Sequence, residues 1–270
     1  MVLPGRAGVL VERRPLRPPA FARYVAIGDS TSEGLDDPDG QGGYRGWANR
    51  LAERIAADQG GLLYANLAIR GRTTKQIGDE QLAPALAMRP DLVTVSGGTN
   101  DVLGRHFDAG VYASHLLAIL EPLVASGATV TMFTLPDLRS VMPLARLLGT
   151  RVLDLNAAIR DCCARSGAIL CDLARYEIAS DPRLWSDDRL HANAAGHARI
   201  AEALAYFIGL HEDMSWSDPL PDRPRATAMD VAKAEWAWTR RHLLPWVWRH
   251  LQGKSSGDGV KPKRPELLPL

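Results

Sequence analysis

The residue types that acyl transfer requires occur at four places that are far apart in the chain. Ser30 ends the tripeptide Gly-Asp-Ser, Gly71 and Asn100 each follow an apolar run, and Asp188 precedes His191 by three residues. A serine hydroxyl attacks an ester carbonyl when an imidazole accepts its proton and a carboxylate orients the imidazole. The backbone N–H groups of Ser30 and Gly71 and the side-chain amide of Asn100 would supply donors for the oxyanion. The sequence therefore contains every group that a serine hydrolase needs.

Short apolar runs alternate with amphipathic helical patterns from residue 23 onwards. This alternation predicts a parallel sheet with helices on both faces. The predicted strands are residues 24–27, 62–68, 92–95, 128–134 and 168–173, and the last helix is predicted over 194–210. The carboxyl ends of parallel strands meet at one edge of a sheet, where α/β proteins bind their ligands. We therefore expect the candidate groups, which follow predicted strands, to converge in one crevice.

Both ends of the chain differ from this pattern. Residues 1–22 are predicted to be a flexible lead-in, and 23–210 the catalytic domain. Residues 211–252 are predicted to form a polar, Pro-rich linker and then a helical extension, rich in Trp and Arg and interrupted at Pro245. Residues 253–270 are predicted to be disordered. The extension can be interpreted as a helix that meets lipid, as a lid beside an acyl pocket, or as tryptophans packed on the catalytic domain or a partner subunit; we favour packing.

Composition limits the class of partner and the compartment. The 270 residues carry 32 Lys and Arg against 31 Asp and Glu, so the basic field expected of a nucleic-acid-binding protein is missing. Three cysteines are too few for a disulfide framework, and we predict reduced thiols. Arg13-Arg14 is followed by a Pro-rich segment instead of an apolar one, and no run is long enough to span a membrane. These features predict a cytoplasmic protein that acts on a small-molecule ester.

Four blocks of sequence resemble those of the SGNH (GDSL-type) hydrolase superfamily, over roughly residues 23–210. Gly28-Asp29-Ser30 matches the nucleophile block, and residues 66–71 resemble the block that offers the oxyanion-hole glycine. Residues 98–101 match the G-x-N-D block and 188–191 the D-x-x-H block, whereas Thr31 is more polar than the residue usual after the serine. The resemblance implies a flavodoxin-like three-layer α/β/α fold with a five-stranded parallel sheet. It also implies ester hydrolysis that needs no metal or cofactor.

The expected activity is hydrolysis of short- to medium-chain carboxylic esters, of the lipase or acyl-esterase type or of the carbohydrate O-deacetylase type. The alternative is a phosphate- or nucleotide-binding α/β module in which the turn at Ser30 holds an anion. That turn lacks both the G-x-G-x-x-G pattern and a P-loop lysine, and an anion site leaves the pair Asp188 and His191 unexplained. A binding protein without catalysis is disfavoured because no member of the set is missing.

Several neighbouring residues are expected to have structural roles. Asp187 could replace Asp188 as the orienting acid, but its register with His191 is poorer. Asp29 and Asp101 are expected to accept hydrogen bonds from loop N–H groups. Arg70, Arg72 and His106 flank the expected cleft and could touch a polar acyl or alcohol group, but we expect them to be solvated surface residues. His197, on the last helix, is expected to pack or to lie on the surface.

Overall fold

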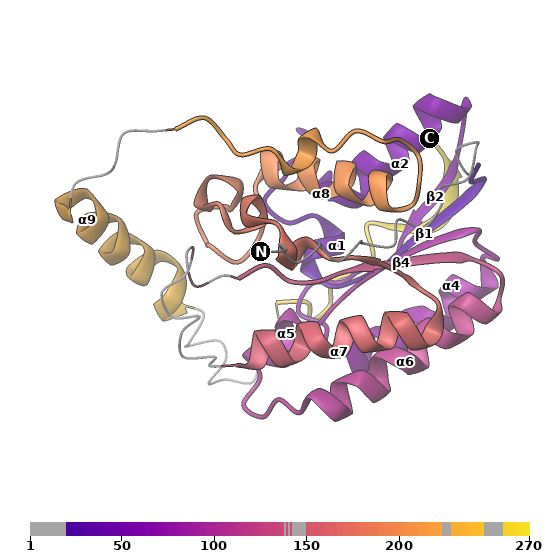
Figure 1. Ribbon diagram of the computed structural model, residues 1–270, viewed down its shortest axis with the longest axis horizontal. Helices are drawn as coiled ribbons and strands as arrows, with labels where there is room; N and C mark the ends of the chain where they lie inside the picture. Colours follow the sequence, from indigo (N-terminus) through magenta and orange to yellow (C-terminus); the bar gives the residue numbers. More distant parts are fainter. Residues whose placement is uncertain (1–19, 138, 140, 142–149, 223–227, 246–255) are drawn as a thin grey trace, which may run out of the picture.

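The computed structural model describes residues 20–137, 139, 141, 150–222, 228–245 and 256–270. Its centre is a six-stranded sheet in the order β5-β4-β3-β1-β2-β6. Five strands are parallel, and they are β1 (Arg23–Gly28), β2 (Leu63–Asn66), β3 (Leu92–Ser96), β4 (Thr129–Phe133) and β5 (Ile169–Cys171). Helices cover both faces of the sheet (Figure 1). The chain therefore has the three-layer α/β/α fold that the sequence predicts.

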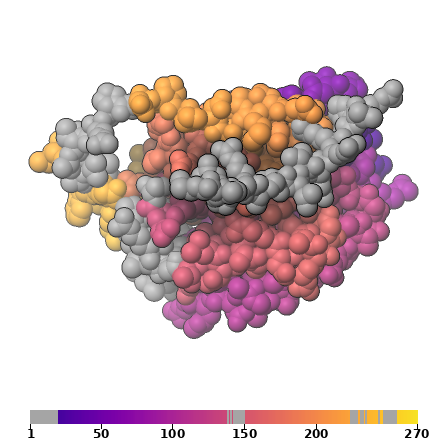
Figure 2. All heavy atoms as spheres, viewed as in Figure 1, coloured from indigo at the N-terminus to yellow at the C-terminus, as the bar shows by residue number. Residues whose placement is uncertain are grey.

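Each face of the sheet has its own hydrophobic core. One core lies under α2 (Gly46–Gln59) and α8 (Ala194–Phe207), and the other under α4 (Ala83–Ala87), α6 (Ala109–Ala125) and α7 (Arg151–Ser166). Successive side chains of a strand point to opposite faces, so Tyr24 and Ala26 of β1 enter the first core while Val25 and Ile27 enter the second. The space-filling view likewise shows α8 and α7 on opposite sides of the molecule (Figure 2).

Short elements follow the strand ends and build the loops around the candidate site. After β1 and β2 come α1 (Ser30–Glu33), α3 (Thr74–Ile77) and the π-helical turn η1 (Gly78–Leu82). After β3 comes α5 (Thr99–Leu103), and after β5 come the 3-10 turns η4 (Leu173–Arg175), η5 (Glu177–Ser180) and η6 (Pro182–Leu184). Because these connections are built from short helices and turns, the residues in them have little conformational freedom.

The sheet has one strand more than the five predicted. Strand β6 (Arg264–Pro269) pairs antiparallel with β2, so the prediction that residues 253–270 are disordered is wrong for this stretch. The guanidinium of Arg264 lies 5.6 Å from the centre of the Tyr64 ring and donates to the Tyr64 carbonyl at 2.8 Å. Proline and basic residues are typical of edge strands, where one side needs no partner. A polar, Pro-containing tail can therefore form a strand when the edge of β2 supplies its hydrogen bonds.

The extension after α8 is helical in part. The 3-10 turn η7 (Ser215–Ser217) buries Trp216, whose ring lies 4.6 Å from that of Tyr176. Helix α9 (Ala228–Trp238) continues through the π-helical turn η8 (Thr239–Leu243) to Pro245, where the sequence predicts an interruption. Trp238 is buried and Trp236 is exposed. The other two tryptophans of the extension and most of the lead-in, residues 1–19, lie outside the described residues.

The cysteines and the apolar character of the helices bear on two expectations drawn from the sequence. Cys162, Cys163 and Cys171 are free and buried, as predicted. Within the described ranges, none of the helices combines the length and the apolar character that crossing a membrane requires.

Because Arg264 joins β6 to Tyr64 of β2, replacing it should weaken the edge of the sheet. We expect Arg264→Ala to lower the free energy of unfolding by about 1–2 kcal/mol, through loss of the cation–π contact and the hydrogen bond. Thermal unfolding followed by circular dichroism measures this. Glu266→Ala, an exposed change on the same strand, is the control, and equal melting temperatures for the two variants would contradict the assignment of β6.

Candidate active site

Ser30 stands at the start of α1, immediately after a sharp turn at the end of β1. Gly28 has a φ of 150°, and a Cβ built on it would lie 2.4 Å from the Ser96 carbonyl oxygen, so only glycine fits there. The side chain of Gln81 accepts from the Gly28 N–H at 2.7 Å and donates to its carbonyl at 2.9 Å. Asp29 caps α1 by accepting from Thr31 N–H. The turn is therefore fixed on both sides, and it directs Ser30 off the sheet edge.

Three of the predicted site residues form one continuous hydrogen-bonded row. Ser30 Oγ lies 2.8 Å from His191 Nε2, and His191 Nδ1 lies 2.6 Å from Asp188 Oδ2. A neutral imidazole that accepts the serine proton at Nε2 carries its own proton on Nδ1, facing Asp188. Ser30 is only 8% exposed. The row thus has the arrangement that a serine nucleophile, its base and an orienting acid require.

The acid and the base of this row belong to one tight turn. Asp188 Oδ1 accepts from the N–H groups of Leu190 at 2.9 Å and His191 at 3.0 Å, while Oδ2 binds the imidazole. Arg189, between them, has a φ of 62°, in the left-handed region. Asp187 is exposed, and Asp188 is the neighbour that binds His191. The alternative that Asp187 orients the imidazole therefore lacks a structural basis.

The charges of the row favour an imidazolium next to a carboxylate. Burial alone would raise the pKa of Asp188, but the hydrogen bond and charge of His191 outweigh burial and hold it well below its ordinary value. Burial alone would lower the pKa of His191, but the hydrogen bond and charge of Asp188 raise it above 6.5. The charge of Asp36 adds to this rise. The site therefore stabilises the charged form that His191 would adopt on taking a proton.

A second carboxylate lies beside the row, and sequence patterns did not reveal it. The Ser186 hydroxyl is 2.6 Å from both Asp36 Oδ2 and Asp188 Oδ1, and Asp36 Oδ2 is 3.9 Å from His191 Nδ1. Ligand atoms of Asp36, Asp188 and His191 lie within 4.8 Å of one another, the spacing of a metal site. A cation bound there would need the Nδ1 lone pair, but in the tautomer whose Nε2 accepts the serine proton Nδ1 carries a proton instead. Metal binding and the hydrogen-bonded row therefore exclude each other.

Gly71 lies in a loop that is tied to the turn at Ser30. Its φ of 75° is left-handed, and the loop joins the end of β1 through a 3.2 Å bond from Ile69 N–H to the Gly28 carbonyl. Arg70 N–H donates to Glu33 at 2.8 Å, and the Arg70 guanidinium pairs with the same carboxylate. The expectation that Arg70 is a solvated surface residue is wrong, because this pair braces the loop against α1.

Asn100 lies next to the nucleophile turn. Its amide nitrogen donates to the Arg72 carbonyl at 3.0 Å and lies 3.4 Å from Asp29 Oδ2. Burial raises the pKa of Asp29 to about 6, against the hydrogen bonds from Thr31 that lower it, so Asp29 is an acceptor at neutral pH. As expected, Asp29 and Asp101 accept from loop N–H groups, Asp101 from Thr74 at 3.0 Å. That Asn100 donates to an oxyanion stays a prediction.

Arg72 and His106, the other two side chains expected to flank the site, differ in exposure. Arg72 forms an ion pair with Glu80 at 2.8 Å, and its own side chain is 15% exposed, so it is less solvated than expected. His106 is exposed, as expected for a surface residue.

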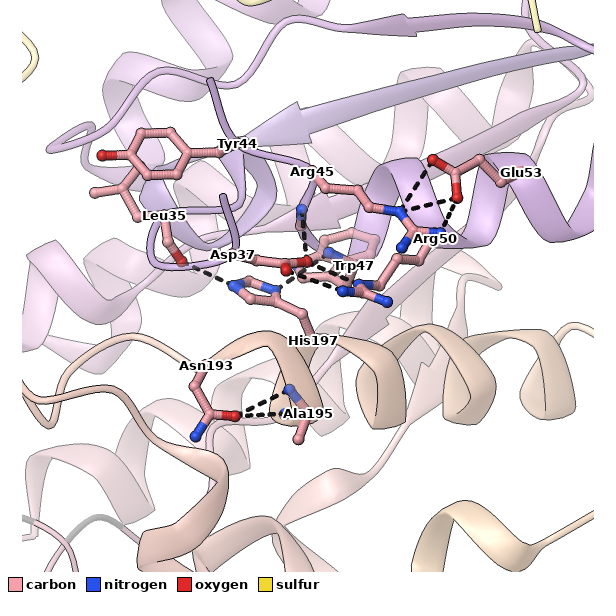
Figure 3. A network of polar contacts seen from close by, with 12 residues as sticks. Leu35, Asp37, Tyr44, Arg45, Trp47, Arg50, Glu53, Asn193, Ala195 and His197 are labelled. Atoms are coloured by element: carbon pink, nitrogen blue, oxygen red, sulfur yellow. Dashed lines mark hydrogen bonds and ion pairs between the residues drawn. The ribbon is translucent and has the colours of Figure 1, made fainter. Parts of the chain in front are cut away.

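A separate polar network joins the segment after Ser30 to α8, which follows the turn of His191 (Figure 3). Buried His197 of α8 donates from Nε2 to the Leu35 carbonyl at 2.9 Å, and its Nδ1 accepts from Trp47 N–H at 3.2 Å. Burial lowers the pKa of His197 to about 4, so the ring is neutral and both bonds persist at neutral pH. The expected packing role of His197 is correct, and its polar contacts hold two parts of the site together.

An apolar pocket lies beside the row. Thr31 and Thr99, the neighbours of Ser30 and Asn100, line it together with Leu190 and Ala192, which flank His191. The rest of its wall is mostly apolar and includes Phe133, Leu135, Leu173, Ile178, Ile200 and Trp216. Such a pocket suits a hydrocarbon chain attached to a carbonyl held at Ser30.

Solved structures of esterases have the same fold. An esterase, EstA, from Pseudoalteromonas sp. superposes with a TM-score of 0.56 at 20% identity, over 69% of this chain and 96% of its own. A lipase/acylhydrolase from Enterococcus faecalis gives 0.58 at 20% identity, over 70% and 95%. A catalytic mutant of Axe2, an acetylxylan esterase from Geobacillus stearothermophilus, gives 0.59 at 17% identity, over 73% and 96%.

A search of curated proteins found no match. The profile of the GDSL-like lipase/acylhydrolase family, in contrast, matches residues 26–199, which include every predicted site residue. The chain therefore belongs to the GDSL-like lipase/acylhydrolase family and is a carboxylic ester hydrolase.

Proposed function

We propose that the protein hydrolyses short- to medium-chain acyl esters through a covalent acyl-enzyme on Ser30. His191 acts as general base and then general acid, and Asp188 orients it. The observation that supports this most strongly is the row of 2.8 Å and 2.6 Å contacts that joins Ser30 Oγ, both His191 nitrogens and Asp188. This row supplies a nucleophile, a proton acceptor at the correct atom and a fixed tautomer.

The cycle follows from which atoms face one another. His191 Nε2 takes the hydroxyl proton as Ser30 Oγ attacks the ester carbonyl, and the imidazolium is stabilised by Asp188. Nε2 then gives the proton to the leaving alkoxide oxygen, so the alcohol departs and the acyl group stays on Ser30. Water enters in place of the alcohol, gives its proton to Nε2 and attacks the acyl carbonyl. Return of the proton to Ser30 Oγ releases the carboxylic acid.

The oxyanion of each tetrahedral intermediate needs donors close to Ser30. We assign this role to the backbone N–H groups of Ser30 and Gly71 and to the Asn100 amide. The 3.4 Å contact of Asn100 with Asp29 is long, so a substrate oxyanion can replace it at little cost. Removing one such donor typically costs about 3 kcal/mol in the barrier.

The pocket supports an acyl chain longer than acetyl as the preferred substrate. Its lining is mostly apolar and includes Leu190 and Ala192, which flank His191, together with Ile178 and Trp216. Burying each methylene of an acyl chain contributes about 0.8 kcal/mol. A carbohydrate acetyl ester would leave most of this surface without a partner, so we favour the acyl-esterase type over the O-deacetylase type.

The charges around Ser30 argue against the alternative of a phosphate- or nucleotide-binding module. Asp29 is buried next to Ser30, and Asp36 and Asp188 flank His191. A phosphate held at the turn would face these carboxylates without a basic partner from the row, apart from a protonated His191. The Ser30 hydroxyl is also already engaged by the imidazole.

Replacing the nucleophile tests the proposal directly. We expect Ser30→Ala to lower kcat for p-nitrophenyl acetate by at least about 10⁴-fold, because the variant lacks the hydroxyl that His191 activates. Ser114→Ala, on the exposed face of α6, is the control and should keep full activity. A fluorophosphonate probe should label the wild type and not Ser30→Ala. An active Ser30→Ala variant would overturn the proposed role.

The pH profile tests the base. Neutral His191 is the active form, so kcat/KM should fall as pH drops through its pKa, which Asp188 raises above 6.5. Asp29, with a pKa of about 6, adds a second ionisation on the acid side. Asp188→Asn should shift the midpoint of the fall in activity to lower pH and reduce kcat by about 10³–10⁴-fold. A midpoint that stays in place would show that Asp188 does not set the pKa of the base.

The pocket predicts a dependence on acyl chain length. Ala179 lines it, so Ala179→Phe should fill space that a longer chain occupies. We expect the ratio of kcat/KM for p-nitrophenyl hexanoate over acetate to fall at least about tenfold. Ala57→Phe places the same ring on the exposed face of α2 and should leave the ratio unchanged. A ratio unchanged in both variants would place the acyl chain elsewhere.

A further inference from the structure

The C-terminal extension contacts the candidate site at the turn that carries its acid and base. The indole N–H of Trp238, the last residue of α9, donates to the Asp188 carbonyl oxygen at 3.0 Å. Trp238 is 8% exposed, although α9 lies at the margin of the molecule (Figure 1). This contact fixes the backbone of the residue whose side chain binds His191.

A second pair of side chains holds the residue between the acid and the base. The Arg189 guanidinium lies 5.0 Å from the centre of the Trp238 ring, and its Nη1 is 2.7 Å from Glu235 Oε1. Glu235 and Trp238 are three residues apart, so both lie on the face of α9 that meets the turn. Arg189 has left-handed backbone geometry, which is unfavourable for a residue other than glycine. The contacts with α9 offset this cost.

The C-terminal tail, described from residue 256 to 270, touches the loop that carries Gly71. Gly257 is buried, and a Cβ built on it would lie 2.0 Å from the Arg70 carbonyl oxygen. No side chain fits at that distance, so the backbone of the tail packs directly on the residue before Gly71. The Arg70 carbonyl belongs to the peptide that includes the Gly71 N–H, the proposed oxyanion donor. Displacing this peptide would therefore move that donor.

The chain beyond Gly257 is firmly anchored. Lys263 Nζ donates to the carbonyls of Tyr44 and Arg45, both at 2.9 Å, and β6 pairs with β2. Lys263 and Arg264 therefore both bind backbone carbonyls of the catalytic domain. This anchoring on the C-terminal side of Gly257 holds its contact with Arg70 in place.

We propose that the C-terminal extension and the tail that follows it position the active site: Trp238 of the extension holds the turn of Asp188 and His191, and Gly257 of the tail holds the loop of Gly71. The inference rests on the proposed function, because it assigns these two segments to the acid–base pair and to the oxyanion hole. Neither Trp238 nor Gly257 touches the reacting atoms; each acts through a backbone carbonyl of the segment it contacts. From the sequence we favour packing of the tryptophans over a lid beside an acyl pocket, and the contact of Trp238 with Asp188 places one of them at the turn of the acid and the base.

Trp238→Phe tests the first contact, because it removes the N–H donor and keeps an aromatic ring, smaller than the indole, for Arg189. We expect kcat for p-nitrophenyl acetate to fall on the order of tenfold, with KM unchanged, since small displacements of catalytic groups cost rate more than binding. The acid-side midpoint of kcat/KM should also move to lower pH as the Asp188–His191 contact loosens. Trp236→Phe, an exposed change on the same helix, is the control.

Gly257→Ala tests the second contact. The added methyl group should push the Arg70 peptide away and lower kcat by a similar factor, while the acid-side midpoint stays at its wild-type pH, because the Asp188–His191 pair is untouched. Ser256→Ala is the control on the neighbouring exposed residue. The two variants therefore differ in pH dependence, which a general loss of stability would not produce.

The outcomes separate this inference from the proposed function. An inactive wild type, or an active Ser30→Ala variant, would refute the proposed function itself. An active, Ser30-dependent wild type with Trp238→Phe and Gly257→Ala both within twofold of their controls would refute the positioning role alone. Circular dichroism of each variant identifies a loss of folding, and if Gly257→Ala does not fold, Trp238→Phe decides the question.

Discussion

The hydrogen bond between Ser30 and His191 is the contact on which the rest of the site depends. It joins residues 161 positions apart, one on the turn after β1 and the other on the turn before α8. The sheet fixes the turn of Ser30 at the end of β1. Helix α8 follows the turn of His191 and is joined to the segment after Ser30 through His197, which helps to keep the contact at 2.8 Å. Gly28 and the amide of Gln81 hold the turn of Ser30 in place. Neutral His197 makes the link from α8 to the segment after Ser30 by binding the Leu35 carbonyl.

The charges around His191 favour transfer of the proton from Ser30 to the imidazole. Asp188 and Asp36 both lie near His191, and their charges oppose the burial that would otherwise keep the imidazole neutral. A base in this environment accepts a proton readily, and the resulting cation has a partner at 2.6 Å. The apolar pocket next to the row provides the opposite environment, suited to an acyl chain. The polar row and the apolar pocket together explain why an ester is the substrate class.

Sequence patterns were sufficient for the parallel sheet and for the residues of the row. Each strand is a local apolar run, each site residue follows a strand or a short motif, and parallel strand ends must converge. Contacts between residues far apart in the sequence leave no local pattern and could not be predicted. They join Glu33 to Arg70, 37 positions apart, Asp36 to Ser186, 150 apart, and Asp188 to Trp238, 50 apart. Strand β6 was missed because its composition is that of a solvated tail, and its pairing comes from the edge of β2.

Trapping the acyl-enzyme shows whether Ser30 carries the acyl group during turnover. Wild-type protein mixed with p-nitrophenyl acetate and quenched in acid within milliseconds would be digested and analysed by mass spectrometry. The account predicts one acetyl group per chain, attached to the peptide that contains Ser30 and lost with time as water regenerates the enzyme. Turnover without any acetylated Ser30, or stable acetylation of a different residue, would contradict the claim that Ser30, activated by His191, carries the reaction.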